Sequence, residues 1–317
     1  MQVSAQKIVV LGTGGTIAGT AAQAGDNIGY TAAQVGVGEL LAAVPGLDAV
    51  AGGPLVVEQI AQIDSKDMEF AVWRALAQRC AECMDDPSVR GVVITHGTDT
   101  IEETAWFLHS VLHAKKPVVL TCAMRPSTAL VPDGPQNLLD AVAVAAAEGA
   151  QGVVVVAAGA IHGAQRVHKV HPYRVDPFSS GDAGPLGWVE EGAVRLVQEW
   201  PLAVDGRGLC AIESMPTESS WPWVELVMNH AGAGGRAVDA LVREGVQGLV
   251  VACTGNGTIH HALEAALLRA QAVGVRVVRS TRCPEGQLLP KPGDAFAAAP
   301  GLSPVKARIT LVLDLLD

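Results

Sequence analysis

Aromatic and basic residues are scarce in this chain of 317 residues. Phe, Trp and Tyr make up 4% of the sequence, and 22 Lys and Arg are outnumbered by 32 Asp and Glu, for a formal net charge of −10. Proteins that bind nucleic acid depend on clustered Lys and Arg, and the sequence contains no such cluster. The charge balance therefore argues against a nucleic-acid partner.

Long apolar runs and a cysteine framework are also missing. Gly, charged residues or turn residues interrupt every apolar stretch short of the roughly 20 residues that span a bilayer. The first residues lead directly into an apolar segment without the pattern of a secretion signal. Six cysteines in a chain of this size do not form a disulfide framework. These features predict a cytoplasmic protein with reduced thiols and no membrane partner.

The chain does contain an alternation of two hydrophobic patterns. Short β-branched runs typical of buried strands are separated by longer segments with helical periodicity. The expected strands are 7–11, 55–63, 91–95, 117–122, 152–157, 209–213, 248–253 and 275–279. The expected helices are 67–84, 101–114, 137–148, 234–244, 260–272 and 304–316, the last with Ser303 as its N-cap. The alternation predicts parallel βαβ units.

The alternation stops between Pro185 and Asp205, where the sequence indicates a hairpin followed by Glu-Trp-Pro-Leu. We therefore expect a two-domain α/β protein, with a larger N-terminal domain whose mostly parallel sheet is flanked by helices. The expected bounds are 1–187 for that domain, 188–208 for a linker and 209–317 for a smaller C-terminal α/β domain.

Two Gly- and Thr-rich runs follow expected strands, namely Gly12-Thr-Gly-Gly-Thr-Ile-Ala-Gly19 and Thr95-His-Gly-Thr-Asp-Thr100. Ligands of open parallel sheets bind outside the carboxyl ends of the strands, so both runs are expected to face one crevice. The first run is not a dinucleotide-binding turn, because G-x-G-x-x-G from Gly12 would need glycine at Ile17. A tight turn and an anion-binding backbone explain this run equally well.

The second run contains one threonine with an expected structural role and two residues without one. Thr100 and Glu103 match a capping box at the start of the helix 101–114. Thr98 and Asp99 precede that helix in a loop, where an exposed polar pair favours function. Two threonine hydroxyls and a carboxylate at one sheet edge suggest covalent acyl chemistry.

Other polar residues have two interpretations each. Ser65 is the expected N-cap of the helix containing Met68 and Leu76, and the same helix start could hold a substrate carboxylate. Lys169 is either a surface lysine or a lysine that assists deprotonation of a hydroxyl.

Metal and serine-hydrolase sites are not expected. Cys80 and Cys83 fall in an expected helix with no second cysteine pair, and His109 and His113 lack the adjacent glutamate of a metalloprotease motif. No Gly-x-Ser-x-Gly elbow occurs either.

Taken together, the motifs resemble those of the bacterial L-asparaginase family. The matching runs, in order, are Thr-Gly-Gly-Thr-Ile-Ala-Gly, Asp-Ser-Lys-Asp-Met, Thr-His-Gly-Thr-Asp-Thr-Ile-Glu-Glu-Thr, Ala-Met-Arg-Pro, Asp-Gly-Pro-Gln-Asn, Gly184-Pro-Leu-Gly, Gly255-Asn-Gly, Val278-Arg-Ser-Thr-Arg and Lys306-Ala-Arg. The resemblance spans almost the whole chain. It implies hydrolysis of L-asparagine to L-aspartate and ammonia, leaves weaker activity on L-glutamine open, and requires no metal or organic cofactor.

The resemblance also implies roles for individual residues. Thr16 would be the nucleophile, and Tyr30, one of only two tyrosines, would help to remove its proton, although a packing tyrosine is the other interpretation. Thr98, Asp99 and Lys169 would form a second catalytic constellation. Asp99 would hold the α-ammonium of the substrate.

Further residues would bind substrate. The backbone of Gly15 would contribute with Thr98 to an oxyanion site, Ser65 would bind the α-carboxylate, and Ala123 would contact the substrate. Asn256 matches a family position that reaches the site of a neighbouring subunit, in a homotetramer of intimate dimers.

Two positions depart from the family pattern. Lys66 stands where many relatives have Gln or Glu, and a cation there would repel the substrate ammonium unless it points outward. The turn from Cys283 is shorter than the family loop that delivers a glutamate from a neighbour, so that role is not assigned to Glu285. These departures motivate an alternative, a non-catalytic amino-acid-binding or regulatory protein. A subunit of a tRNA-dependent amidotransferase and a nucleotide-binding α/β protein are weaker alternatives.

Overall fold

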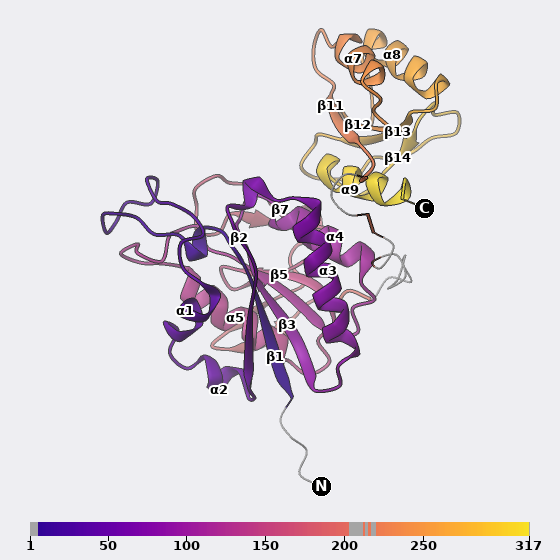
Figure 1. Cartoon of the computed structure of the whole chain (residues 1–317). Coiled ribbons are helices and arrows are strands. Elements are labelled where there is room, and N and C mark those ends of the chain that lie inside the picture. Colours follow the sequence, from indigo (N-terminus) through magenta and orange to yellow (C-terminus); the bar gives the residue numbers. More distant parts are fainter. Residues whose placement is uncertain (1–5, 203–211, 213–214, 217–219, 317) are drawn as a thin grey trace. The chain divides into compact units, whose positions relative to one another are not determined.

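The computed structural model describes residues 6–202, 212, 215–216 and 220–316. Its contacts divide the chain into two compact units, Met1–Met215 and Pro216–Asp317 (Figure 1). Each unit contains a sheet of its own, eight-stranded in the first and four-stranded in the second. The expected fold class, a large mostly parallel sheet with helices and a smaller C-terminal α/β part, is confirmed.

The large sheet has the strand order β10-β9-β6-β5-β4-β3-β1-β2. Its strands are β1 (Lys7–Gly14), β2 (Leu55–Ile63), β3 (Val89–Thr95), β4 (Pro117–Thr121), β5 (Gly152–Ala157), β6 (Ala160–Gly163), β9 (Gly187–Glu190) and β10 (Ala193–Leu196). The strands from β2 to β5 pair in parallel, whereas β5, β6, β9 and β10 pair antiparallel.

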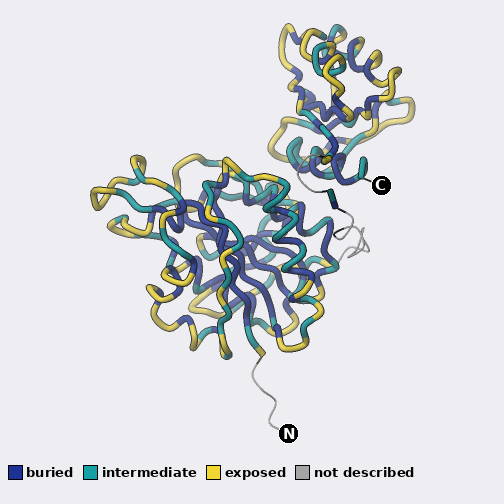
Figure 2. The backbone as a smooth tube through the Cα atoms, in the orientation of Figure 1, coloured by how far each residue is buried: buried dark blue, intermediate teal, exposed yellow. Residues whose placement is uncertain are grey.

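Helices cover both faces of this sheet (Figure 1). One face packs against α1 (Val37–Ala42), α2 (Leu47–Ala51) and α5 (Gly134–Ala146), and the other against α3 (Phe70–Asp85) and α4 (Ile101–Val111). Strands enclosed in this way are expected to be apolar at nearly every position. Every residue of β4 and β5 is buried, as the dark central strands in Figure 2 illustrate.

The parallel strands run in the order 2-1-3-4-5, which places β1 and β3 side by side. The chain leaves β1 toward β2 on one side and continues from β3 toward β4 on the other. Connections that diverge in this way open a crevice at the carboxyl ends of the two central strands, where ligands of doubly wound sheets bind. The two motifs of the sequence follow β1 and β3.

The end of the first unit differs in detail from the sequence expectation. The hairpin expected after Pro185 exists as β9 and β10. Both strands belong to the large sheet, so most of this hairpin lies within the stretch 188–208 that we expected to be a linker. A two-stranded ribbon of β7 (His168–Lys169) and β8 (Phe178–Ser179) precedes it, followed by the short helix η3 (Gly181–Ala183). The strand expected at 209–213 lies, apart from Ile212, outside the described residues.

The second unit is a smaller parallel sheet, β11-β12-β13-β14, formed by β11 (Val224–Met228), β12 (Gly248–Cys253), β13 (Arg276–Thr281) and β14 (Ala297–Ala298). Its helices are α7 (Arg236–Arg243), α8 (His261–Ala272) and α9 (Pro304–Asp314). The hydroxyl of Ser303 accepts the N–H of Lys306, which confirms the expected N-cap of α9.

One expected helix begins differently. Residues Ser65–Asp67 form the 3₁₀ helix η2, and α3 starts only at Phe70. The N-cap of η2 is Asp64, whose carboxylate accepts the N–H of Lys66, so the expectation that Ser65 caps the helix is wrong. None of the helices in the described part of the chain has the length and apolar character needed to cross a membrane.

Candidate functional site

The carboxyl ends of β1 and β3 bring the two motifs together. Gly12 pairs with Thr95 in the parallel register of these strands. The hydroxyl of Thr13 then donates to the Thr95 carbonyl oxygen at 2.9 Å. Beyond this bond, the first motif turns into the 3₁₀ helix η1 (Thr16–Ala18) and the second into the loop before α4.

Two glycines allow the motifs to touch. Gly15 has a φ of 81°, and a Cβ at this position would overlap the backbone of Gly97. A Cβ on Gly97 would in turn overlap the hydroxyl of Ser65. The first clash is with backbone atoms and the second includes the Ser65 Cβ, so neither can be relieved by rotating a side chain. Only glycine therefore permits this three-way contact. The first motif, the second motif and the start of η2 therefore meet at one point.

Thr16 faces a tyrosine from a neighbouring segment. The Thr16 Oγ1 lies 2.7 Å from the Tyr30 hydroxyl oxygen. Backbone hydrogen bonds in both directions between Thr20 and Thr31, each 2.9 Å, close the segment 20–31 into a loop that returns Tyr30 to the site. Near its tip, Asp26 accepts the N–H groups of residues 28 and 29, which holds the pKa of the Asp26 carboxyl below its ordinary value.

The second motif meets a lysine from β7, 71 residues further along the chain. Lys169 Nζ donates to Thr98 Oγ1 at 2.8 Å and to Asp99 Oδ1 at 2.5 Å. The Lys169 side chain is mostly buried, whereas that of Asp99 is about half exposed. A second link, from His168 to Glu102 at 3.1 Å, joins the same ribbon to the first turn of α4.

Ser65 connects these parts. Its side chain is almost fully buried, and its Oγ accepts the Asp99 N–H at 3.2 Å. The Thr100 hydroxyl donates to the Ser65 carbonyl at 2.8 Å and makes no cap hydrogen bond to its own helix. Thr100 is the N-cap residue of α4 as expected, but its hydroxyl does not make the expected capping-box bond to the helix, because it bonds across the loop instead.

Lys66 points away from this cluster toward two carboxylates. Its ammonium lies 2.8 Å from Asp67 and 3.2 Å from Asp64, and it is largely exposed. Hydrogen bonds to Asp67 and then Asp64 raise the pKa of Lys66. The local charge of the ammonium is therefore offset by its own neighbours.

Ala123 lies next to the first motif, in a loop whose backbone is held by hydrogen bonds. It is buried and packs in one cluster with Ile17 and Ala18. The Asp133 carboxylate accepts the N–H groups of Met124 at 2.9 Å and Arg125 at 3.0 Å. No motif of the sequence points to this role of Asp133. The residue directly precedes α5, but its carboxylate makes no cap bond to that helix and bonds the preceding loop instead.

The other expected site residues have different environments. The N–H of Gly15 donates to the Ile63 carbonyl at 2.9 Å. Asn256 lies on an exposed turn of the second unit, where its amide exchanges two hydrogen bonds with the backbone of Leu289. Glu285 is exposed in the same unit.

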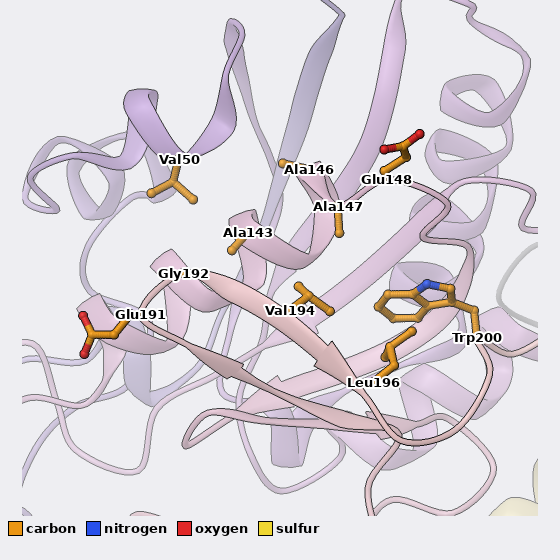
Figure 3. A pocket seen from close by; sticks show the side chains of 10 residues that line it. All are labelled: Val50, Ala143, Ala146, Ala147, Glu148, Glu191, Gly192, Val194, Leu196 and Trp200. Atoms are coloured by element: carbon orange, nitrogen blue, oxygen red, sulfur yellow. The ribbon is translucent and has the colours of Figure 1, made fainter.

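Two thiols and one cavity of the first unit lie apart from this cluster. Cys80 and Cys83 are buried within α3, and burial raises the pKa of both thiols. Among the described residues, no group of three His, Cys, Asp or Glu side chains could hold a metal ion. A cavity of about 670 Å³, lined by α5, the β9–β10 hairpin and Trp200, shares no residue with the cluster around Thr16 (Figure 3).

Comparisons with known proteins agree along the whole chain. The family model "Asparaginase, N-terminal" matches residues 7–202, and "Glutaminase/Asparaginase C-terminal domain" matches residues 223–316. The chain is 39% identical to L-asparaginase 2 of Escherichia coli (strain K12), over 97% of this chain and 88% of that protein. It is 36% identical to the glutaminase-asparaginase of Pseudomonas fluorescens biotype A, over 97% of this chain and 86% of that protein.

A solved structure shares the fold. The probable cytoplasmic L-asparaginase from Campylobacter jejuni superposes with a TM-score of 0.90 at 37% identity, covering 98% of this chain and 95% of that one. The two family models together account for both units, and the relatives match nearly the full length of the chain. The chain therefore belongs to the asparaginase family and is an enzyme of that family.

Proposed function

We propose that this protein hydrolyses L-asparagine to L-aspartate and ammonia through a covalent intermediate on Thr16. The observation that carries the proposal is the pair of hydroxyl groups at the ends of β1 and β3, each with its own proton-handling partner. Thr16 has Tyr30 at 2.7 Å, and Thr98 has Lys169 at 2.8 Å. Relatives named for asparaginase and glutaminase activity support the substrate class.

Tyr30 is the proposed base for the nucleophile. Its hydroxyl oxygen is within hydrogen-bond reach of Thr16 Oγ1, which is the geometric requirement for proton transfer. In its deprotonated form the Tyr30 oxygen takes the Thr16 proton, while the Thr16 oxygen forms a bond to the side-chain amide carbon of the substrate and the carbonyl π electrons move to the oxyanion. The tetrahedral intermediate collapses when its C–N bond breaks and a proton is passed to the nitrogen, which leaves as ammonia. Water then attacks the ester, and aspartate is released.

Lys169 prepares Thr98 to donate a hydrogen bond. Since an ammonium can only donate, its bond to Thr98 Oγ1 occupies a lone pair of the hydroxyl and leaves the hydroxyl proton for another partner. That proton is the proposed donor to the oxyanion of the tetrahedral intermediate. One such donor is typically worth about 3 kcal/mol of transition-state stabilisation. The N–H of Gly15 is bonded to the Ile63 carbonyl. The lack of a side chain at Gly15 lets the loops after β1 and β3 approach each other closely.

The α-substituents of the substrate have complementary groups nearby. The Asp99 carboxylate has one oxygen on Lys169 and is half exposed, so its second oxygen can accept the substrate ammonium. The Ser65 Oγ accepts the Asp99 N–H, which leaves the Ser65 hydroxyl proton for the substrate carboxylate. Ala123 packs beside Ile17 and is proposed to contact the substrate there.

Steady-state ammonia release tests the reaction. L-Asn, D-Asn, L-Gln and β-aspartyl peptides are compared, and mass spectrometry of the acid-quenched enzyme detects an aspartyl ester on the peptide containing Thr16. Turnover of L-Asn with this ester is the expected result. Turnover that survives unchanged in Thr16→Ala would contradict the mechanism, and tight aspartate binding without hydrolysis of any amide would favour the non-catalytic alternative.

We also propose a homotetramer of intimate dimers, with Asn256 contributing to a neighbour's site. The exposed turn of Asn256 and the remaining hydrogen-bond capacity of its amide support this role. Thr16→Ala and Asn256→Ala chains are refolded separately and as a mixture. Recovery of activity only in the mixture is expected, because hybrid sites regain both residues. Full activity of a monomer in light scattering would contradict the assembly.

The proposed location is the cytoplasm. Five cysteines in the described part of the chain are free thiols, four of them buried, and the structural relative from Campylobacter jejuni carries the same location in its name. Cell fractionation with antibody detection tests the location, and recovery in a periplasmic extract would contradict it.

A further inference from the structure

Two adjoining cavities lie between α5 and the β9–β10 hairpin. The first, of about 670 Å³, is the cavity of Figure 3. The second, of about 550 Å³, extends toward the start of α5, where Asp133 and Asn137 line it. Glu191, at the tip of the hairpin, lines both cavities, so they form one continuous groove, the α5 groove. Neither cavity is lined by a residue of the proposed catalytic site.

A buried carboxylate with an unpartnered oxygen lines this groove. Asp140, on α5, lines the second cavity and is only 4% exposed. Its Oδ1 accepts the side-chain N–H of Gln136 at 2.8 Å, whereas no group among the described residues donates to its Oδ2. Burial raises the pKa of the Asp140 carboxyl, against the opposite effect of the Gln136 bond. A buried carboxylate oxygen is costly without a donor, so Oδ2 is suited to binding a cationic group.

The other charges of the groove are also negative. None of the described residues that line it is Lys or Arg. Glu190 is paired with Arg195 through two hydrogen bonds, but no described residue pairs with the carboxylates of Glu148 and Glu191. Figure 3 shows these last two carboxylates at different ends of the first cavity. Together with Asp140, the α5 groove therefore presents three carboxylates at intervals along its length.

The surface between these carboxylates is apolar or aromatic. Alanines of α5 line one side of the first cavity, and Val194, Leu196 and Trp200 line the other (Figure 3). Walls of this kind bury methylene groups favourably, and an indole face attracts a cation. The matching ligand alternates positive charges with short methylene chains. A metal ion matches less well, because no group of three acidic, His or Cys side chains among the described residues could hold one.

We propose that the α5 groove binds a linear aliphatic polyamine, with one ammonium on Asp140 Oδ2 and others at Glu191 and Glu148. The ammonium at Asp140 supplies the missing donor and offsets the cost of burying that carboxylate. The methylene chains lie against the apolar walls between the charges. This site is separate from the proposed catalytic site, and the inference does not depend on asparagine hydrolysis.

Calorimetric titration of the full-length protein with spermidine tests the proposal. The titration is made at about 150 mM salt, where attraction between distant exposed charges is screened. n-Butylamine, with a single ammonium, and magnesium chloride are the comparison ligands. Excess L-aspartate in a parallel titration occupies the proposed catalytic site and keeps spermidine out of it.

Three variants separate the charge of the groove from its structure. Asp140→Asn removes the buried charge but keeps the side-chain size and an acceptor for Gln136. Glu191→Asn removes a carboxylate from a turn position with a φ of 51°, which Asn adopts at less cost than Glu. Glu244→Gln is the matched control, because Glu244 is an exposed carboxylate at the end of α7 in the second unit.

The expected result is a loss of affinity that is confined to the groove. Asp140→Asn should weaken spermidine binding about tenfold to hundredfold, the effect of losing one charge-assisted hydrogen bond at a buried group. Glu191→Asn should weaken binding about threefold, while its unfolding temperature stays equal or rises. Glu244→Gln and excess L-aspartate should leave the spermidine Kd unchanged. n-Butylamine should bind the wild type at least about tenfold more weakly than spermidine.

The absence of spermidine binding to the folded wild type would overturn the proposal, as would equal affinities of the wild type and Asp140→Asn. Displacement of spermidine by an equal concentration of magnesium would show only a general attraction of cations to an acidic protein. Loss of binding in the presence of L-aspartate would assign the ligand to the catalytic site instead. If Asp140→Asn does not fold, unchanged affinity in both Glu191→Asn and Glu148→Gln would contradict the site.

Discussion

The two sides of the candidate site are supported in opposite ways. On the Thr98 side, His96 is buried beneath the loop, and β7 supplies a lysine that is itself mostly buried. On the Thr16 side, the partner Tyr30 belongs to the segment 20–31, most of whose residues are exposed, with Ile28 at 81%. The proposed oxyanion side is thus preorganised by the core, whereas the proposed nucleophile depends on a segment with little packing of its own.

This difference suggests a division of labour. A rigid oxyanion site costs no reorganisation during the chemical step, while a base on an exposed segment can withdraw to admit substrate. Hydrogen bonds at the start of the segment connect it to another loop of the unit. The Ser127 hydroxyl donates to the Gly19 carbonyl, and the Thr128 hydroxyl accepts the Ala21 N–H. The following predictions test this comparison, from the largest expected effect to the smallest.

Loss of the proposed nucleophile should have the largest effect. Thr16→Ala removes the atom that forms the ester, so kcat for ammonia release should fall by about 10⁴-fold or more. Thr16→Ser is the matched control, since it keeps the hydroxyl. Aspartate binding measured by calorimetry should change little in either variant, and a Thr16→Ala enzyme with wild-type turnover would exclude this residue as the nucleophile.

Removal of the Tyr30 hydroxyl should affect chemistry without affecting stability. Tyr30→Phe keeps the ring but removes the proposed base, so kcat should fall by about 10²-fold to 10⁴-fold. The unfolding free energy should change by less than about 0.5 kcal/mol, because the segment is exposed. Urea unfolding and ammonia release measure the two quantities. A loss of stability comparable to the loss of activity would assign Tyr30 a packing role instead.

A methyl group on Gly97 should damage the rigid side in both respects. Gly97→Ala would overlap the Ser65 hydroxyl and Cβ, so the unfolding free energy should fall by about 1–3 kcal/mol, and kcat should fall about 10²-fold as the loop shifts. Gly38→Ala is the control, since Gly38 lies in α1 with open space around it. That variant should be neutral or more stable by about 0.5–1 kcal/mol.

The turn at Asp26 should have a modest effect on the exposed side. Its pKa is lowered by the N–H groups of Gly29 and Ile28. The contribution of the charged form is complete above the unfolded pKa of about 3.9 and is lost as the pH falls through the lower folded value. Asp26→Ala should therefore reduce kcat by about threefold to tenfold at pH 7, with Asp26→Asn closer to wild type. If kcat changed with pH near neutrality in the wild type and this dependence disappeared in Asp26→Asn, Asp26 would titrate near neutral pH, which would contradict its lowered pKa.

Lys66 should have the smallest effect. Its ammonium is exposed and paired with Asp64 and Asp67, so Lys66→Gln should leave KM and kcat within about twofold of wild type. A marked decrease in KM for L-asparagine, steeper at low salt, would show instead that the cation repels the substrate ammonium.

Local sequence patterns predicted the elements well where one interaction dominates. The β-branched run at 152–157 coincides with β5, because a strand covered on both faces is apolar throughout. The run at 55–63 coincides with β2, an edge strand of the large sheet whose residues are partly buried or exposed. The Ser303 cap depends on one hydrogen bond to the N–H of Lys306, three residues further along the chain, and was equally predictable. The functions of Ser65 and Thr100 at helix starts were not, because their partners belong to other loops.

The sequence by itself determined the βαβ alternation, the positions of the two motifs after strands, and the residue types available for acyl chemistry. Only the tertiary structure decided that β1 and β3 are neighbours, that Gly15 touches Gly97, and that Lys169 reaches Thr98. Hydrophobic periodicity and capping act over a few residues, so they are visible in a sequence. Strand order and contacts across 71 residues depend on how whole layers pack, and that information is not local.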